Sequence, residues 1–424
     1  TRILAHSFMF LIIQGLFYGD CVFAESPTVP GRARIYPSVV ELEPGQTQQF
    51  KVVMLATRLK GATLAEDVTW AVRGIPGGND EVGTIDADGL YKGPAKVPKP
   101  REIPICAYAP HAANRYLWAT VLMDAPGPSY EQVGAWGEPV ANRTYLVDPH
   151  CVVLDSNKNL IIADYLGSRV LRFTPDGNFL GYLGNGTGEK PGQVIKPRIV
   201  QVGPMSRIFV SDEKSDKPRI QVFSPQGEFL YLFAEKGIGP GHILRAHGMA
   251  FDSQQRLYVV DVDTMRVNIY TPSGAFLRSW GKDGHGVGDF NAPHGITIDG
   301  NDDVFVIGYY GPCQKFTAEG EFLFDFAHGD PPDGAVYFHS VTSDRWGNVY
   351  LTVRGMGGYG GAVEDSEGKR VSAMKYNNNG DYVASLTLSV GAHAENWVCV
   401  DDAGLVYAIY VGWERLGVEV FAPQ

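Results

Sequence analysis

The chain has 424 residues, of which 44% are apolar, so it is long enough to bury the cores of two globular domains. Its net charge is −11 and it has no run of Lys and Arg, which excludes a nucleic-acid partner because phosphate binding needs a basic face. The 51 glycines and the 12% of aromatic residues, with few helix-period stretches, predict an all-β protein rich in tight turns.

The first 24 residues have the pattern of a secretory signal peptide. Arg2 and His6 precede an apolar run from Phe8 to Phe17, and Ala24 offers a small residue for cleavage. The run is short for a bilayer span, so an uncleaved N-terminal anchor is the alternative, and no other segment is predicted to cross a membrane. We therefore expect a secreted, periplasmic or cell-surface protein.

The four cysteines that come after the predicted signal show no spacing typical of a disulfide framework. An exported protein could pair them in an oxidising compartment, but each lies in an apolar, strand-like stretch. We expect buried free thiols at Cys106, Cys151, Cys313 and Cys399.

Residues 28–125 are predicted to form a separate β-sandwich. Short β-rich stretches alternate with turns, and Trp70 stands in the middle of one stretch, as suits a sandwich core. The sequence Gly-Thr-Ile-Asp at 83–86, followed by Gly-Leu-Tyr at 89–91 and a proline, resembles bacterial immunoglobulin-like domains. That resemblance implies a spacer or adhesion unit, with 125–128 as the linker to the C-terminal part of the chain.

From residue 149 onward one short pattern recurs six times. Its clear copies are 149–155, 246–252 and 293–299, in which a His stands second and an Asp seventh. The second residues of the copies are 45 to 57 positions apart, a period typical of stacked or radial supersecondary units. Because equivalent positions of such units meet in space, we expect a ring of six side chains: His150, Arg198, His247, His294, His339 and Asn396.

Each unit contains four strand signals, which predicts a four-stranded propeller blade. The third unit combines His247-Gly with Leu257-Tyr-Val-Val-Asp and Arg266-Val-x-x-Tyr, a phrasing that resembles the NHL-repeat six-bladed β-propellers. The resemblance implies an NHL-type propeller over 129–424. The last unit has only three strands, so we expect residues 130–136 to pair with 417–421 and close the ring.

The loops after the second strand of each unit are predicted to surround the ring at the mouth of the central channel. Their polar, charged and aromatic residues suit a small molecule, a peptide or a protein partner. We select Tyr310, Arg198 and Tyr410 as catalytic candidates beside the ring. The loop 354–373 carries a Gly-rich insertion, and the sequence does not decide between a mobile lid and a passive solvated loop.

Three of the histidines resemble those of the peptidyl-hydroxyglycine amidating lyases, propeller enzymes in which three His from alternate blades bind one zinc. His150, His247 and His339 occupy those positions in units one, three and five. The resemblance implies a divalent metal, zinc being the first candidate, with an open position for water or substrate. Lys214 stands where the family has its catalytic Tyr, so the metal triad is retained more clearly than the catalytic apparatus. His294 is compatible with a fourth ligand, a proton donor or a filler.

Three functions stay open on the sequence. The first is an exported propeller that binds a ligand or partner at its channel mouth, with a divalent metal in the His ring. The second is a metal-dependent lyase or hydrolase, so enzyme activity is undecided. The third is a structural or adhesion scaffold without metal, in which the histidines hydrogen-bond across a wet channel.

Overall fold

The computed structural model describes residues 31–55, 62–123, 130–139, 145–213, 216–309, 311–327, 337–354, 363–364, 370–371, 373–386, 397–411 and 415–423. Within these residues the protein is all-β, as predicted, and its one helical segment is the 3-10 turn η1 (Pro204–Ser206). No helix in this part of the chain is long and apolar enough to cross a membrane. The predicted signal peptide, residues 1–24, lies outside the described residues.

The N-terminal domain contains three sheets, with strand orders β1-β4-β5, β3-β10-β9-β8 and β2-β12-β11-β6-β7. Its strands are β1 (Ala33–Tyr36), β2 (Val39–Leu42), β3 (Thr47–Gln49), β4 (Lys51–Met54), β5 (Thr63–Leu64), β6 (Thr69–Val72), β7 (Ile75–Pro76), β8 (Gly78–Asn79), β9 (Gly83–Ile85), β10 (Leu90–Lys92), β11 (Glu102–Tyr108) and β12 (Tyr116–Met123). They share one apolar core that includes Phe50, Trp70 and Tyr91. The immunoglobulin-like identity of this domain stays a prediction.

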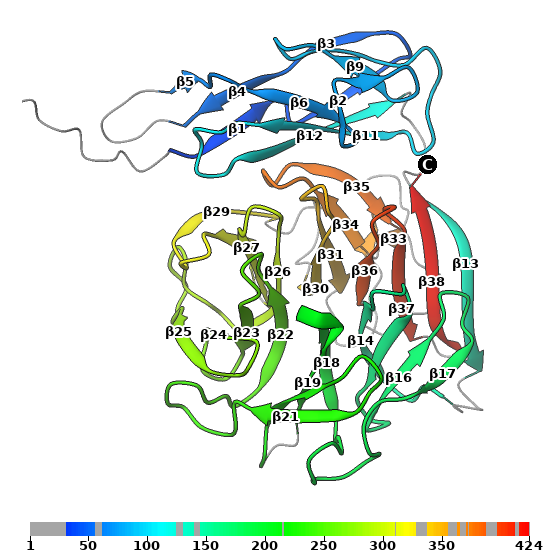
Figure 1. The fold of residues 1–424 in the computed structure, drawn as a ribbon, viewed down its shortest axis with the longest axis vertical. Coiled ribbons are helices and arrows are strands. Elements are labelled where there is room, and N and C mark those ends of the chain that lie inside the picture. Colours follow the sequence, from blue (N-terminus) through cyan, green and yellow to red (C-terminus); the bar gives the residue numbers. More distant parts are fainter. Residues whose placement is uncertain are drawn as a thin grey trace, which may run out of the picture.

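In the described residues outside the N-terminal domain, six four-stranded sheets form the blades of a β-propeller (Figure 1). Five of them run consecutively along the chain: β14 (Pro149–Leu154), β15 (Leu160–Asp164), β16 (Arg169–Phe173) and β17 (Phe179–Tyr182); β18 (Pro197–Val202), β19 (Ile208–Asp212), β20 (Arg219–Phe223) and β21 (Phe229–Phe233); β22 (Ala246–Phe251), β23 (Leu257–Asp261), β24 (Arg266–Tyr270) and β25 (Phe276–Trp280); β26 (Pro293–Ile298), β27 (Val304–Gly308), β28 (Cys313–Phe316) and β29 (Phe322–Phe326); β30 (Tyr337–Ser343), β31 (Val349–Arg354), β34 (Ala373–Tyr376) and β35 (Tyr382–Leu386). Between β31 and β34, the short strands β32 (Val363–Glu364) and β33 (Arg370–Val371) pair within the Gly-rich insertion. The predicted six-bladed architecture is confirmed.

The sixth blade joins the two ends of the propeller. Its strands are β36 (Val398–Val400), β37 (Val406–Val411), β38 (Arg415–Pro423) and, as the outermost, β13 (Tyr130–Pro139). β13 contains the stretch that the sequence predicts to close the ring, and it pairs antiparallel with β38 from Tyr130 opposite Pro423 to Pro139 opposite Arg415. The innermost strand β36 packs against both β30 and β14, so the first and fifth blades flank the sixth.

Five of the six copies of the repeat end in an Asp, which stabilises the turn after it, and the second copy ends in Gly203. The carboxylate of Asp155 accepts the backbone N–H groups of Asn157 and Asn159, and Asp299, Asp344 and Asp401 repeat this pattern in their own blades. Such Asp-capped turns fix the hairpin between the first and second strands. The second strands are apolar runs that stay buried because blades pack on both of their faces, as in β23.

The N-terminal domain docks on the propeller face that carries these first hairpins, which is the end of the inner strands opposite the ring residues. Tyr116 and Asn301 exchange hydrogen bonds, and Ser38 donates to Asp381 at 2.6 Å. Trp118 packs edge-on against Trp346, with ring centroids 5.5 Å apart. In Figure 1 the domain, in blue, accordingly lies beside β29 and β35.

The four cysteines predicted to be free thiols are free and buried in the structure. Burial raises the pKa of Cys106 and of Cys151 to about 12, so neither is a thiolate at neutral pH.

Candidate functional site

The five ring residues that the structure describes all lie in β-bulges of innermost strands. In β14 the register shifts between Pro149 and Cys151, so His150 stands outside the regular ladder. The same shift surrounds the other four: Arg198, His247, His294 and His339. A bulge redirects the side chain of its extra residue. The repeated bulge therefore turns equivalent side chains of successive blades toward each other at the mouth of the channel.

Three of the imidazoles, from consecutive blades, lie against one another. The ring centroids of His247 and His294 are 4.7 Å apart, and those of His294 and His339 are also 4.7 Å apart. Their exposed fractions are 4%, 1% and 2% in chain order. Tyr309 packs edge-on against His294, with centroids 4.6 Å apart, and Trp397 stands beside His339. Contact thus runs between neighbouring blades, whereas the predicted triad used alternate blades.

His294 has one ring nitrogen engaged and one without a partner. Its Nδ1 lies 2.8 Å from the backbone oxygen of His339, which only accepts, so Nδ1 carries the proton. In the neutral ring this leaves a lone pair on Nε2. That nitrogen is buried and meets no hydrogen-bonding partner within the described part of the chain.

His150 is held by an aspartate, an arginine and a tyrosine. Arg198 Nη1 donates to His150 Nδ1 at 3.2 Å, so the imidazole proton is on Nε2, which lies 3.2 Å from Asp148. The ring of Tyr165 stacks on His150 at 4.6 Å, and the guanidinium of Arg198 lies 4.6 Å from the same tyrosine ring. His150 is therefore a positioned neutral side chain.

Glu213 links the His150 group to the three neighbouring imidazoles of His247, His294 and His339. Its Oε2 accepts from Arg198 Nε at 2.6 Å, and its Oε1 lies 3.0 Å from His247 Nε2, within ion-pair distance but without hydrogen-bond alignment. Glu213 was not predicted from the sequence, which drew attention to the neighbouring Lys214 instead. A signal was available: Glu213 is the first residue after the second strand of its blade, where the chain turns at the mouth.

Burial sets the charge state of the site. It lowers the pKa of His247 to about 2, and the nearby Arg198 and Arg245 act in the same direction. It also lowers the pKa of His294 well below the ordinary value, with a further contribution from His247. Burial raises the pKa of Glu213, and Arg198 opposes that rise. The imidazoles of His247 and His294 are therefore neutral at physiological pH.

The aspartates that end the second strands do not belong to the ring. Asp164 accepts the backbone N–H groups of Val147 and Asp148, and Asp261 accepts those of Leu244 and Arg245. Each carboxylate thus anchors the loop that leads into the ring residue of its own blade. This contribution is structural, because these carboxylates accept hydrogen bonds from backbone N–H groups.

The predicted catalytic residues have different positions. Arg198 lies in the ring, bonded to His150 and Glu213. Tyr410 is on β37, and its hydroxyl lies beside Gly137 on β13, the outermost strand of the closing blade, which is away from the ring. Tyr310 lies outside the described residues, as do Asn396 and Lys214.

The alternate-blade zinc triad stays a prediction, and the contacts of His150 are unfavourable for it. Among the described residues, no three His, Cys, Asp or Glu side chains gather as a metal-binding group. His150 accepts a hydrogen bond on Nδ1 and carries its proton on Nε2, so neither nitrogen offers a lone pair to a metal ion. The charge of Arg198 beside it also opposes a cation.

No known protein family and no curated protein matches the sequence. In fold the chain is similar to a protein of unknown function from Bacteroides thetaiotaomicron, with a TM-score of 0.51 and 12% identity over 94% of this chain and 99% of that chain. A gluconolactonase from Xanthomonas campestris has a TM-score of 0.46 and 12% identity over 70% of this chain and 98% of that chain. A catalytically inactive virginiamycin B lyase from Staphylococcus aureus has a TM-score of 0.44 and 14% identity over 84% of this chain and 100% of that chain. At such identities the likeness concerns the fold alone.

Proposed function

We propose that the His-ring mouth of the propeller binds a small polar molecule, in a protein that is exported. The observation that carries the proposal is the Nε2 atom of His294, a buried lone pair that meets no partner within the described residues. Native proteins rarely leave such an atom unsatisfied, because its lost hydration is not repaid. A ligand that donates a hydrogen bond to Nε2 accounts for it.

The surrounding residues define the chemistry of the ligand. The neutral imidazoles of His247 and His294 favour N–H or O–H donors, while Arg198 supplies positive charge for a carbonyl or anionic group. The ring histidines are at most 4% exposed, so only a small group reaches them. A small molecule, or one side chain of a peptide, therefore suits the site better than a flat protein surface.

The same electrostatics favour binding over acid–base catalysis. An efficient general base has a pKa near the operating pH. The pKa of His247, about 2, is far below that range, and the pKa of His294 is also well below its ordinary value. Lyase or hydrolase activity is the weaker candidate on this ground.

The prediction of a zinc site is tested separately, by metal analysis. Metal analysis by mass spectrometry, after chelation and zinc repletion, is expected to give no stoichiometric ion if the His150–Arg198 contact persists in solution. A stoichiometry near one that is lost in His247→Phe would instead support the zinc triad.

Binding is tested by long-range ¹H–¹⁵N spectra of the histidine side chains during titration with a library of small polar compounds. A true ligand shifts the ring nitrogens of His294 and His247, and His294→Phe abolishes its binding while preserving an aromatic ring of similar size. His111→Phe, at an exposed histidine of the N-terminal domain, is the control. Ligands that bind equally to wild type and His294→Phe would contradict the proposal.

A further inference from the structure

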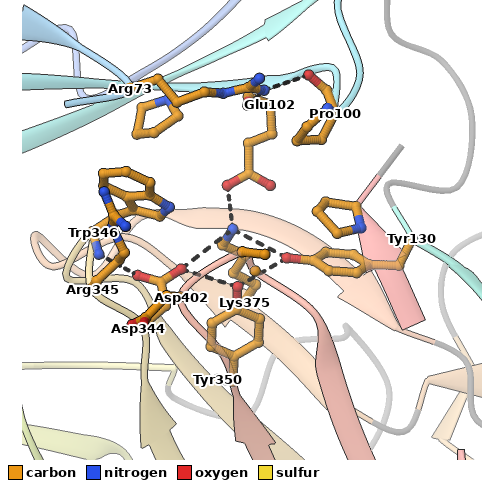
Figure 2. Close-up of a pocket in the computed structure, with 14 residues that line it drawn as sticks. Arg73, Pro100, Glu102, Tyr130, Asp344, Arg345, Trp346, Tyr350, Lys375 and Asp402 are labelled. Carbon is orange, nitrogen blue, oxygen red and sulfur yellow. Dashed lines mark hydrogen bonds and ion pairs between the residues drawn. The ribbon is translucent and has the colours of Figure 1, made fainter. Parts of the chain in front are cut away.

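A cavity lies away from the ring, at the junction of the two domains. It has a volume of 310 Å³, which is near the lower end of the usual range for ligand pockets, about 300–1,000 Å³. Arg73, Glu102 and Pro104 of the N-terminal domain form one wall, and Trp346, Lys375 and Ala403 of the propeller form the other. Figure 2 shows these walls facing each other across the junction.

A buried ion pair connects the two walls. Lys375, on β34, donates to Glu102, on β11, and also to the hydroxyl of Tyr130 at 3.2 Å. Tyr130 and Tyr350 share a hydrogen bond of 2.9 Å, and Tyr350 donates to Asp344 at 3.1 Å. Burial opposes the charge of Lys375, but Glu102, Tyr130 and Asp344 together raise its pKa, so the amine is an ammonium ion.

One atom of this cluster lacks a partner. Glu102 Oε1 accepts from Lys375, whereas Glu102 Oε2 is buried and meets no hydrogen-bond donor within the described residues. The side chain is 9% exposed and lines the cavity, and Figure 2 shows only one of its oxygens joined to Lys375. A carboxylate oxygen without a donor is costly in a buried setting, and apolar residues would hold two domains together equally well. The unpartnered oxygen therefore indicates a donor that is bound in the cavity.

The charge balance of the cavity excludes a strongly charged ligand. Its lining contains three basic and three acidic side chains: Arg73, Arg345, Lys375, Glu102, Asp344 and Asp402. An ammonium group at Glu102 Oε2 would meet the charge of Lys375 next to it, whereas a hydroxyl donor would meet no such repulsion. The rest of the lining suits a molecule with both polar and apolar faces, since Pro100, Pro104 and Trp346 contribute to it.

We infer that the interdomain cavity binds a neutral, hydroxyl-rich small molecule of about monosaccharide to disaccharide size, one hydroxyl of which donates to Glu102 Oε2. Arg73 keeps this acceptor in place, because its Nη2 donates to the backbone oxygens of Pro100 and Glu102 at 2.6 and 2.9 Å. Since both domains form the walls, an occupied cavity also holds the N-terminal domain in its docked position.

The test is saturation-transfer NMR and titration calorimetry on the full chain with D-glucose, D-galactose, maltose and lactose. At least one of these sugars is expected to bind, and the amine and uronic-acid forms of the monosaccharides are expected to bind about tenfold more weakly. Absence of binding by all four neutral sugars, or tighter binding of the charged forms, would overturn the inference.

Two variants and one control locate the site. Ala403→Tyr fills the cavity from an exposed turn without touching the ion pair, and it is expected to abolish binding. Gln254→Tyr places the same side chain at the equivalent turn position of another blade and should bind as the wild type does. Glu102→Gln, which keeps the shape of the side chain, should weaken binding about tenfold. Unchanged binding by Ala403→Tyr would refute the assignment, whatever the stability of Glu102→Gln.

Discussion

Closure of the propeller depends on two glycines that lie opposite each other, Gly137 on β13 and Gly417 on β38. A Cβ at position 417 would lie 2.1 Å from the carbonyl oxygen of Trp136 and 2.6 Å from the Cα of Gly137. Both atoms belong to backbone, so neither can move aside as a flexible side chain would. Gly417→Ala therefore forces β13 away from β38, and we expect it to destabilise the closing blade.

The size of this destabilisation depends on the steric crowding at position 417 and on the number of β-ladder hydrogen bonds that are lost. Overpacking at a tight contact costs about 1–3 kcal/mol, and each ladder hydrogen bond lost adds about 0.5–1.5 kcal/mol. With one such bond lost, the free energy of unfolding falls by about 1.5–4.5 kcal/mol. Unfolding entropy of about 2.1 cal/mol/K per residue gives roughly 0.6 kcal/mol/K for a propeller of this size, so the Tm falls by about 2.5–7.5 °C.

Differential scanning calorimetry measures this shift, and amide hydrogen exchange locates it. Gly134→Ala is the matched control in the same strand, because its Cβ would first meet the side chain of Val420 at an ordinary 3.7 Å. Exchange is expected to accelerate in β38 of Gly417→Ala but not in β24, on the far side of the ring. Equal Tm values for Gly417→Ala and Gly134→Ala would refute the reasoning about closure.

Three further predictions concern buried side chains. Burial and the neighbouring Asp303 raise the pKa of Asp299 to about 6, so Asp299 favours folding below its unfolded pKa, about 3.9, and that contribution is lost as the pH rises through 6. Asp299→Asn removes this loss. In urea unfolding, the free energy of unfolding of the variant relative to that of the wild type should therefore rise by about 1–3 kcal/mol between pH 4 and pH 7. A difference that stays constant with pH would contradict this prediction. Glu213→Gln leaves Arg198 without its carboxylate, and chemical denaturation should show a loss of about 2–4 kcal/mol, whereas an unchanged midpoint would mean that the pair is exposed in solution. Trp70→Ala empties the core of the N-terminal domain and should cost about 3–5 kcal/mol, visible by calorimetry as earlier unfolding of that domain, while a small effect would place Trp70 outside the core.

The sequence alone determined the architecture of the propeller. Each blade has a buried apolar second strand such as β23. Every copy of the repeat except the second, which ends in Gly203, also has an Asp such as Asp155 that caps the turn before that strand. These signals act over a few residues, so they can be recognised in a single sequence without an alignment of homologues. The last unit has only three strands, and an open sheet edge needs a partner. The sequence therefore also predicted that residues 130–136 complete this blade.

The contacts within the ring were decided by tertiary structure. The sequence placed these side chains at equivalent positions of one ring. It could not show that the imidazoles of His247, His294 and His339 lie in contact, or that Arg198 donates a hydrogen bond to His150 Nδ1. A bulge rotates a side chain by an amount that depends on the packing of neighbouring blades, and spacing does not encode that packing. The structure therefore shows contact between consecutive blades, and the alternate-blade metal triad stays a prediction.

The contacts at the domain junction could not be predicted from the sequence either. Glu102 and Lys375 are 273 positions apart, in segments whose local patterns predict only strands. Their pairing exists because the N-terminal domain docks on the hairpin face and buries both charges at once, and each charge requires the other in that setting. Short-range patterning fixes strands and turns, whereas only the docked fold brings such distant charges together.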